Sequence, residues 1–266
     1  MVHLRSNSYD NRMAMFLAAV CSQTYAQFED ADGGFIVPQG YRVAEAFEAK
    51  SFGGKWERFG FILESDNRLI LAFRGTSSTT DWISDAIASQ EKYKCVKDAG
   101  LTHRGISNIY YSARPAIVPA LKKQSSSEKR LFITGHSLGG ALATLSAMDM
   151  KKNAGYAHPV VYTFGAPRVG DPEFAHAYRE RVKMSCRVYN LLDAVPLLPP
   201  QTYKPPRKET TYHYMHVNEG IPLQFNNGSV SANHVIGSYY RELAKADPAY
   251  AAALERDNPG FPPPLA

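Results

Sequence analysis

Ser137 is flanked by Gly135 and Gly139, each two residues away, in the stretch GHSLG. A short apolar, partly β-branched run, Leu131 to Thr134, precedes the serine, and strong helix formers from Ala141 to Met150 follow it. We therefore expect Ser137 where a strand turns into a helix, with glycines that permit strained backbone angles and close chain approach. Such a nucleophile elbow exposes the hydroxyl for attack on a carbonyl carbon. The alternative is a glycine-lined turn whose serine only caps the helix.

A serine hydroxyl needs a base to take its proton, and the base needs a carboxylate to orient it. In folds with a nucleophile elbow both follow the serine, with the acid first. Asp193 follows a strand-like run that ends at Leu191, and Pro196 prevents a helix there. We predict that Asp193 is the acid, at the carboxyl end of a strand, although a turn aspartate is the alternative. Asp171 is the rival, but it reads as the N-cap of a helix that begins at Pro172.

The candidate bases are the five histidines after the serine. They are His158, His176, His213, His216 and His234. Chain order excludes the first two, because both precede Asp193. The next two alternate with aromatic residues, as strand positions do. His234 stands on a loop just before the last amphipathic helix, where this order places the base, so we predict it as the base.

The negative oxygen formed during acyl transfer needs two backbone donors. The N–H of Leu138, at the start of the helix after the serine, is the first predicted donor. Phe73 ends another strand-like run, and the glycine that follows lets the next residues approach the site. We predict the N–H of Thr76 as the second donor, with its hydroxyl directed toward the same oxygen. A plain Ser/Thr-rich loop that caps a helix is the alternative reading.

A short amphipathic segment follows this loop, with Trp82, Ile83 and Ile87 on its apolar side. Such a segment could be a lid that moves over an acyl-binding cleft, or a helix packed permanently on the core. The apolar run from Val195 to Leu198 would supply a second apolar surface beside the serine, in addition to the Trp82 segment. Together these segments favour acyl chains over soluble polar esters, because a buried methylene contributes about 0.8 kcal/mol.

The order of elements predicts an α/β protein with a mostly parallel central sheet and helices on both faces. The chain has 266 residues, 44% of them hydrophobic and 21% charged, which suits a single domain over residues 1–266. Residues 255–266, rich in proline, are expected to form a surface or disordered tail. Strand-like runs recur along the chain, and the first two read as an antiparallel hairpin. These runs are Trp56 to Glu64, Arg68 to Phe73, Arg130 to Thr134, Val160 to Phe164 and Arg187 to Leu191.

The N-terminal apolar segment Met13 to Val20 resembles the core of a signal peptide, but Asp10 and Asn11 interrupt its charged flank and no A-x-A site follows. Its helical spacing continues to Tyr25, so we expect a helix packed on the core. No run approaches the roughly 18 apolar residues of a membrane span. Without a recognisable signal, the chain is expected to be cytoplasmic or a mature secreted form.

The net charge of +5 comes from scattered Lys and Arg residues, so a nucleic-acid partner is not expected. Three cysteines, Cys21, Cys95 and Cys186, lie far apart and permit at most one disulfide. No His, Cys, Asp and Glu cluster has metal-ligand spacing, and no glycine-rich loop has a nucleotide-binding pattern. We therefore expect no metal and no cofactor. A monomer is the default expectation.

Six blocks of the sequence resemble the motifs of the class 3, fungal-type triacylglycerol lipases and occur in the same order, over about residues 10 to 245. The blocks are AFRGTSSTTDWISD, HRGISNIYYSARP, ITGHSLGGALATL, TFGAPRVGDPEFA, NLLDAVPLLPP and NHVIGSYY. The resemblance implies an α/β-hydrolase fold and a serine esterase that acts on lipid esters. It implies a triad of Ser137, Asp193 and His234, oxyanion donors at Thr76 and Leu138, and a lid at Trp82.

The chain also departs from that pattern. The disulfide-forming cysteines of the secreted fungal members are absent, and Asn233 precedes the histidine where many members have aspartate. The family also contains phospholipases A1, mono- and diacylglycerol lipases and feruloyl esterases, which the motifs do not separate. A non-catalytic lipid-binding protein with a hydrolase fold is the remote alternative, and it would not need a complete triad.

Overall fold

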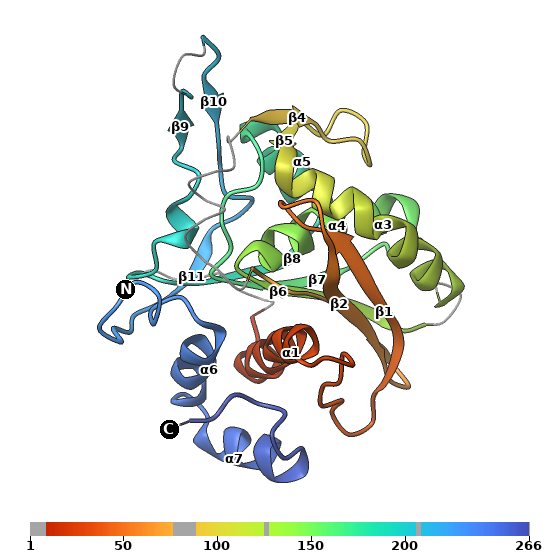
Figure 1. Ribbon diagram of the computed structural model, residues 1–266, viewed down its shortest axis with the longest axis vertical. Helices are drawn as coiled ribbons and strands as arrows, with labels where there is room; N and C mark the ends of the chain where they lie inside the picture. Colours follow the sequence, from red (N-terminus) through yellow and green to blue (C-terminus); the bar gives the residue numbers. More distant parts are fainter. Residues whose placement is uncertain (1–8, 77–88, 125–127, 206–208, 266) are drawn as a thin grey trace.

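A twisted seven-stranded sheet forms the centre of the computed structural model, which describes residues 9–76, 89–124, 128–205 and 209–265 (Figure 1). The strands lie in the order β1-β2-β3-β6-β7-β8-β11. The pairings β1–β2 and β2–β3 are antiparallel, and the four that follow are parallel. The strands are β1 (Arg42–Lys50), β2 (Trp56–Glu64), β3 (Arg68–Phe73), β6 (Arg130–His136), β7 (Val160–Phe164), β8 (Met184–Asn190) and β11 (Gly220–Leu223). The prediction of a mostly parallel sheet is confirmed.

The strand predictions agree with the structure wherever a strand is buried. β2, β3 and β7 have the predicted bounds, β6 extends two residues further, and β8 begins and ends earlier than expected. The predicted hairpin of β2 and β3 is antiparallel, with Glu64 paired to Leu69. The two edge strands, β1 and β11, were missed, because most of their residues are exposed or half-buried and leave a weak apolar signal.

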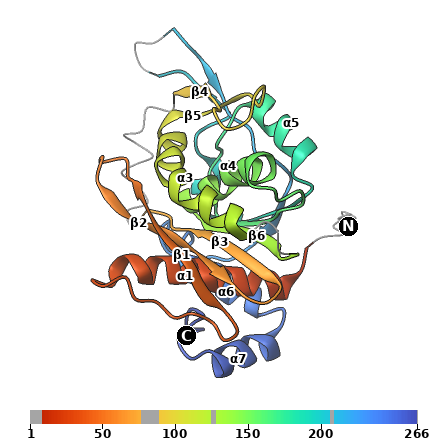
Figure 2. The same cartoon turned by 90° about the vertical axis from the view of Figure 1, so that its right-hand side faces the viewer.

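Helices cover both faces of the sheet, as predicted (Figures 1 and 2). The first layer contains α3 (Arg104–Gln124), α4 (Leu138–Asn153) and α5 (Pro172–Arg181), and the second contains α1 (Asn11–Glu29), α6 (Ile236–Ala244) and α7 (Pro248–Asp257). Alternate strand residues therefore enter two separate cores. On β6, Leu131 and Ile133 pack in the core with α3 and α4, whereas Phe132 packs in the core with α1 and α6.

The N-terminal apolar segment is part of α1, as its helical spacing predicted. The Asp10 side chain caps this helix by accepting hydrogen bonds from the N–H groups of Arg12 and Met13. Small residues such as Ala14, Ala18 and Ala19 are fully buried and let the helix approach the sheet closely. None of the described helices combines the length and apolar character needed to cross a bilayer.

The end of the chain corrects one expectation. α7 continues to Asp257, and the residues after it lie over α1 without disorder. Phe261 is fully buried, with its ring centroid 5.5 Å from that of Phe16. The Gln23 side-chain amide donates hydrogen bonds of 3.2 Å to the Gly260 carbonyl and 2.8 Å to the Phe261 carbonyl. The disordered alternative for residues 255–266 is therefore wrong for 255–265, because one aromatic anchor fixes the segment.

Two short ribbons and a 3-10 turn occupy the end of the molecule where the parallel strands finish. One ribbon pairs β4 (Gln90–Lys92) with β5 (Leu101–His103), and the other pairs β9 (Thr202–Tyr203) with β10 (Tyr212–His213). The β9–β10 ribbon projects away from the sheet (Figure 1), in agreement with the predicted proline-rich excursion. The 3-10 turn η1 (Val195–Leu197) follows β8.

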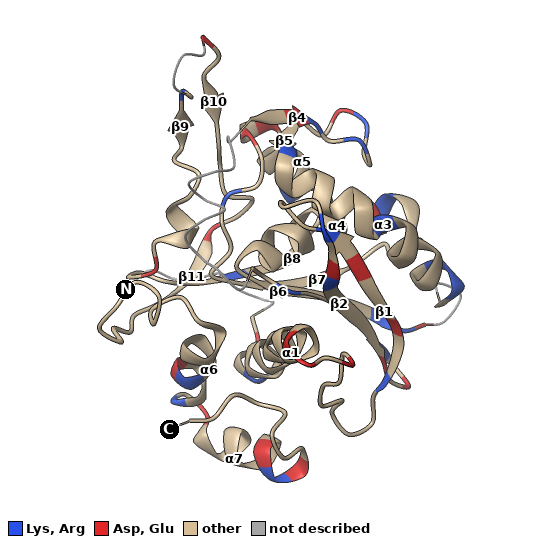
Figure 3. Ribbon diagram, viewed as in Figure 1, with Lys and Arg blue, Asp and Glu red and all other residues tan. Residues whose placement is uncertain are grey.

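Charged residues of both signs are interspersed along the elements and give no face of a single sign in the view of Figure 3. This distribution agrees with the scattered charges of the sequence. Cys21, Cys95 and Cys186 are free thiols. Burial raises the pKa of Cys21 to about 12, so this thiol remains protonated in the core beside Thr134.

Candidate active site

Ser137 lies at a sharp turn between β6 and α4, and its backbone is strained. Its φ is 58° and its ψ −130°, values that cost energy for a residue with a Cβ. The flanking glycines have no room for a side chain. A Cβ on Gly135 would lie 2.1 Å from the Gly139 carbonyl oxygen, and one on Gly139 would lie 2.2 Å from the Phe73 carbonyl oxygen. The two glycines thus permit the predicted elbow, but Ser137 is buried, so its hydroxyl is not exposed as expected from the sequence.

Ser137, His234 and Asp193 form a buried chain of hydrogen bonds. The Ser137 Oγ lies 2.8 Å from His234 Nε2, and His234 Nδ1 lies 2.7 Å from Asp193 Oδ2. All three residues are at most 2% exposed. Because a carboxylate only accepts, Nδ1 carries the imidazole proton, and Nε2 is free to accept from the serine hydroxyl. This arrangement lets the imidazole act as a general base toward Ser137.

Two further groups donate to the Asp193 carboxylate. The Tyr239 hydroxyl donates to Oδ2 at 2.6 Å, and the Val195 N–H donates to Oδ1 at 2.9 Å. Burial and the nearby Asp193 charge raise the pKa of Tyr239 well above its ordinary value, so the hydroxyl stays a donor. These donors orient the carboxylate in a buried site. Sequence reasoning missed Tyr239; its only signal is its place five residues after His234, one turn into α6.

The segment after β3 lies against the nucleophile. A Cβ on Gly75 would lie 3.0 Å from the Ser137 Cβ, so Thr76, the next residue, stands beside the elbow. The Thr76 Oγ1 is buried and has no hydrogen-bond partner among the described residues. Leu138 is the first residue of α4, and the N–H at that position has no intrahelical partner. Both predicted oxyanion donors are therefore next to Ser137.

Arg74 fixes the start of this segment. Its guanidinium lies 3.7 Å from the ring centroid of Phe28 and 4.7 Å from that of Phe59. It also forms a 2.9 Å ion pair with Glu57, and its backbone N–H donates to the Phe59 carbonyl. Burial lowers the pKa of Arg74 from its ordinary value. A buried cation held by two rings and a carboxylate makes the start of the oxyanion segment rigid.

The loop that carries His234 is held by side-chain amides. The Asn190 amide donates to the carbonyls of Phe225 and Asn233, at 3.0 and 3.3 Å. Asn233 accepts a 2.7 Å hydrogen bond from the Asn227 N–H. The side chain of Asn233, which departs from the family pattern, thus stabilises the loop by accepting a hydrogen bond that a carboxylate oxygen could also accept. Asn190, at the last position of β8, ties this loop to the Asp193 loop.

The rival residues have other contacts. Asp171 caps α5, as predicted, by accepting a 2.7 Å hydrogen bond from the Phe174 N–H. The His216 Nε2 donates to the Pro196 carbonyl at 2.7 Å, and burial together with Arg187 lowers the pKa of His216 to about 3. His213 is exposed on β10. The predicted lid residues Trp82, Ile83 and Ile87 lie outside the described residues.

Large apolar side chains are exposed on the two loops that carry the acid and the base. Of the predicted wall from Val195 to Leu198, Val195 is buried and Leu197 is 62% exposed. The other exposed side chains on these loops are Leu191, Leu192, Val230 and Val235, each between 44% and 63% exposed. Exposed apolar side chains on the loops that carry a buried polar triad are typical of a surface that meets apolar ligands.

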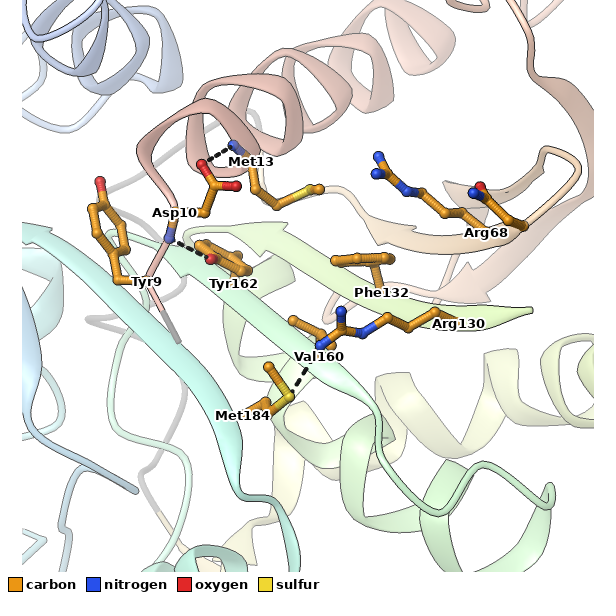
Figure 4. A pocket seen from close by; sticks show the side chains of 10 residues that line it. Tyr9, Asp10, Met13, Arg68, Arg130, Phe132, Val160, Tyr162 and Met184 are labelled. Atoms are coloured by element: carbon orange, nitrogen blue, oxygen red, sulfur yellow. Dashed lines mark hydrogen bonds between the residues drawn. The ribbon is translucent and has the colours of Figure 1, made fainter. Parts of the chain in front are cut away.

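A separate pocket lies at the opposite edge of the sheet, where β3, β6, β7 and β8 begin (Figure 4). It has a volume of about 620 Å³, and its lining includes Asp10, Arg68, Arg130, Phe132 and Tyr162. None of its lining residues belongs to the triad or the oxyanion segment. Sites of open α/β sheets form at the carboxyl ends of the strands, so the edge with Ser137 is the candidate active site.

Comparison with known families shows that residues 70–203 match the family model described as Lipase (class 3). A lipase from Rhizopus niveus is 34% identical over 151 residues, which cover 54% of this chain and 38% of that protein. The chloroplastic phospholipase A1-Igamma2 of Arabidopsis thaliana is 28% identical, over 77% of this chain and 50% of that protein. The chain thus spans half or less of the length of these relatives.

Solved structures show the same architecture. The lipase–propeptide complex of Rhizomucor miehei superposes with a TM-score of 0.63 at 24% identity, over 71% of this chain and 63% of that one. A triacylglycerol lipase whose catalytic centre is described as a serine protease triad superposes with a TM-score of 0.60 at 24% identity, over 71% of this chain and 74% of that one. At such identities the likeness shows the fold, which is the α/β-hydrolase fold expected from the sequence.

Proposed function

The chain belongs to the class 3 lipase family, and from this premise we propose that it is a serine hydrolase of lipid carboxylic esters. The observation that carries the proposal is the buried, hydrogen-bonded series Ser137–His234–Asp193 at a strained elbow. A structural domain or a lipid-binding module would need neither the strain nor the order of donors. We assign Ser137 as nucleophile, His234 as general base and acid, and Asp193 as the group that orients the imidazole.

In the first half-reaction, the Ser137 Oγ attacks the ester carbonyl carbon while His234 Nε2 takes the hydroxyl proton. The Asp193 carboxylate stabilises the imidazolium that forms, without taking the proton itself. The carbonyl oxygen becomes negative and accepts hydrogen bonds from the N–H groups of Leu138 and Thr76, and from the unpartnered Thr76 hydroxyl. The intermediate then collapses: the carbon–oxygen bond to the alcohol breaks, and His234 gives that oxygen its proton.

The second half-reaction releases the acyl group from Ser137. His234 takes a proton from a water molecule, whose oxygen attacks the acyl carbon, and the same two N–H groups hold the negative oxygen. Collapse breaks the bond to Ser137 Oγ, which recovers its proton from His234. The products are a carboxylic acid and the alcohol. Each step uses only groups of this chain, the ester and water. The absence of a cofactor stays a prediction, and retained activity after dialysis against EDTA would test it.

We infer that the substrates are acyl esters of glycerol. The support is a set of exposed apolar side chains on the two loops that carry Asp193 and His234, here called the apolar rim: Leu191, Leu192, Leu197, Val230 and Val235. This rim suits contact with a lipid surface, because apolar side chains gain free energy by leaving water there. The predicted lid at Trp82 would add to this rim, and it stays a prediction from the sequence. Action at the lipid–water interface and a monomeric state are likewise part of the proposal.

The test is a series of initial rates over p-nitrophenyl esters from C2 to C16, with emulsified triacylglycerol, phosphatidylcholine and methyl ferulate measured in parallel. We expect cleavage of medium or long acyl esters and glycerides, with a rise in rate when a soluble ester forms an interface. Ser137→Ala should lose about a million-fold in rate and stay folded. Ser146→Ala, which alters a buried serine within α4, is the matched control and should keep its activity.

The outcomes separate the activities of the family. Preference for phosphatidylcholine would favour a phospholipase A1, the activity named in the Arabidopsis relative. Cleavage confined to acetate and ferulate esters would overturn the lipase assignment and leave a carboxylesterase. No hydrolysis of any ester by a folded protein would overturn the proposed function as a whole and favour the lipid-binding alternative.

A further inference from the structure

His136, the residue before the nucleophile, is 3% exposed. Its Nε2 lies 2.6 Å from the backbone carbonyl oxygen of His234, and its Nδ1 lies 2.7 Å from the Tyr25 hydroxyl. Tyr25 belongs to α1 and lies 111 residues before His136 in the chain. The three residues thus join α1, the elbow and the loop of the base by two short hydrogen bonds.

The partners determine the tautomer of His136. A carbonyl oxygen only accepts, so Nε2 carries the proton and donates to the His234 carbonyl. Nδ1 then accepts from the Tyr25 hydroxyl. Burial, and the proximity of His234, lower the pKa of His136 well below its ordinary value, so its ring stays neutral. This neutrality matters because the two imidazole centroids are 4.6 Å apart, and a charge on His136 would oppose protonation of His234.

Tyr25 also contacts the oxyanion segment. Its hydroxyl oxygen packs against Gly75. A Cβ on Gly75 would lie 2.2 Å from this oxygen and 2.8 Å from the His136 carbonyl oxygen. Burial raises the pKa of Tyr25 above its ordinary value, so the hydroxyl remains protonated and can donate to His136. One hydroxyl therefore bonds to His136 on one side of the elbow and packs against the oxyanion segment on the other.

We propose that Tyr25 and His136 are positioning residues, which fix the backbone of His234 and the oxyanion segment relative to Ser137. The expected effect on catalysis rests on the proposed function, whereas the arrangement of the residues rests on the hydrogen bonds alone. His234 lies on a loop without helix or strand, between β11 and α6. Its ring is held by Asp193 and Ser137, but its backbone needs a separate tie, and the His136 N–H supplies one. Small displacements of a general base are costly in rate.

The experiment compares Tyr25→Phe, His136→Leu and His136→Gln with the wild type. We expect kcat for a soluble p-nitrophenyl ester to fall roughly 10-fold in Tyr25→Phe and roughly 100-fold in His136→Leu, with KM within about twofold. His136→Gln should recover part of the loss, because its side-chain N–H can still donate toward the His234 carbonyl. The matched control is Tyr156→Phe, which removes a 2.9 Å hydrogen bond from a buried tyrosine to Leu121 away from the site.

A second readout is the rate at which an alkyl fluorophosphonate labels Ser137. In that reaction Oγ attacks phosphorus, fluoride leaves and His234 takes the proton, so it requires the base but no particular ester. If the wild type is labelled yet hydrolyses no ester, the proposed function fails while labelling still measures positioning. Labelling and kcat within twofold of wild type in both Tyr25→Phe and His136→Leu would overturn the inference. So would an equal loss in Tyr156→Phe at the same melting temperature.

Discussion

The two edges of the parallel strands differ in strain and in the use of charge. At the carboxyl edge, Ser137 has a left-handed backbone, and the buried Asp193 carboxylate accepts hydrogen bonds from a ring N–H, a hydroxyl and an amide. At the amino edge, Arg68 and Arg130 lie opposite each other on neighbouring strands. Their guanidinium carbons are 5.7 and 5.5 Å from the Phe132 ring centroid, and neither forms an ion pair within the described residues.

The difference shows what marks a reactive site. The amino edge has the open pocket of about 620 Å³, but its charged groups reach solvent and its backbone is unstrained at the lining residues. The carboxyl edge keeps the three triad side chains buried and gives each a specific partner. Buried donors and acceptors in a fixed order can transfer a proton. The solvated guanidinium groups of the amino edge instead lie over the ring of Phe132. The candidate active site is thus identified by ordered hydrogen bonds and a strained backbone, and cavity volume alone does not identify it.

The largest expected effect tests the base at the carboxyl edge. His234→Ala removes the group that takes the Ser137 proton, so kcat should fall by about a million-fold, as for loss of the serine. His213→Ala, on the exposed β10 ribbon, should keep most activity, and so should His216→Ala if it folds. Initial rates on a p-nitrophenyl ester, with circular dichroism as the check on folding, measure this. Near-wild-type turnover in the His234 variant would contradict the assignment of the base.

The pH dependence of stability should also arise at the carboxyl edge. The pKa of His216 is about 3 in the folded protein, lowered by burial, Arg187 and Arg168, and about 6.5 when unfolded. Between these values the unfolded chain binds a proton that the folded chain does not, so stability falls as pH falls from 6.5 toward 3. Allowing for partial exposure, we expect about 2 kcal/mol from this residue.

His216→Gln isolates this contribution, because glutamine retains an N–H for the Pro196 carbonyl and does not titrate. The free energy of unfolding in urea, measured from pH 7 to pH 4, should have a shallower slope in the variant than in the wild type. His103, whose pKa burial lowers to about 4, adds a slope of the same sign that both proteins share. Equal slopes in the two proteins would show that His216 contributes nothing.

The sequence predicts those parts of the site that leave a local trace. The spacing of Gly135 and Gly139 around Ser137 reflects backbone crowding within a few residues, and chain order restricts the choice of Asp193 and His234. The roles of Tyr25, His136 and Tyr239 could not be predicted in this way, because their hydrogen bonds depend on packing between elements that lie far apart in the chain. The fold follows the same rule. Buried strands were predicted from apolar runs, whereas exposed β1 and the anchoring of Phe261 on α1 depend on tertiary contacts.

A smaller effect is expected from the tyrosine that supports the acid. Tyr239→Phe removes one of three donors to Asp193 and leaves the ring packed against Phe225. The carboxylate keeps its bonds to His234 and Val195, so we expect kcat to fall only about 10-fold, in line with the loss of one charge-assisted hydrogen bond. Tyr93→Phe, which removes a buried 2.7 Å hydrogen bond to Leu145 away from the triad, is the control. A change below twofold would show that Tyr239 only fills space.

The smallest effect is expected at the amino edge, where Arg68→Gln and Arg130→Gln should leave ester hydrolysis within twofold of wild type, singly and together. Each substitution removes a contact with the Phe132 ring, which contributes about 0.5–1 kcal/mol at exposed sites. It also removes a like-charge pair between facing residues of neighbouring strands, which costs a similar amount. The two effects oppose each other, so the free energy of unfolding should change by less than about 1 kcal/mol. A tenfold loss of activity in the double variant, at unchanged stability, would contradict the functional contrast between the two edges.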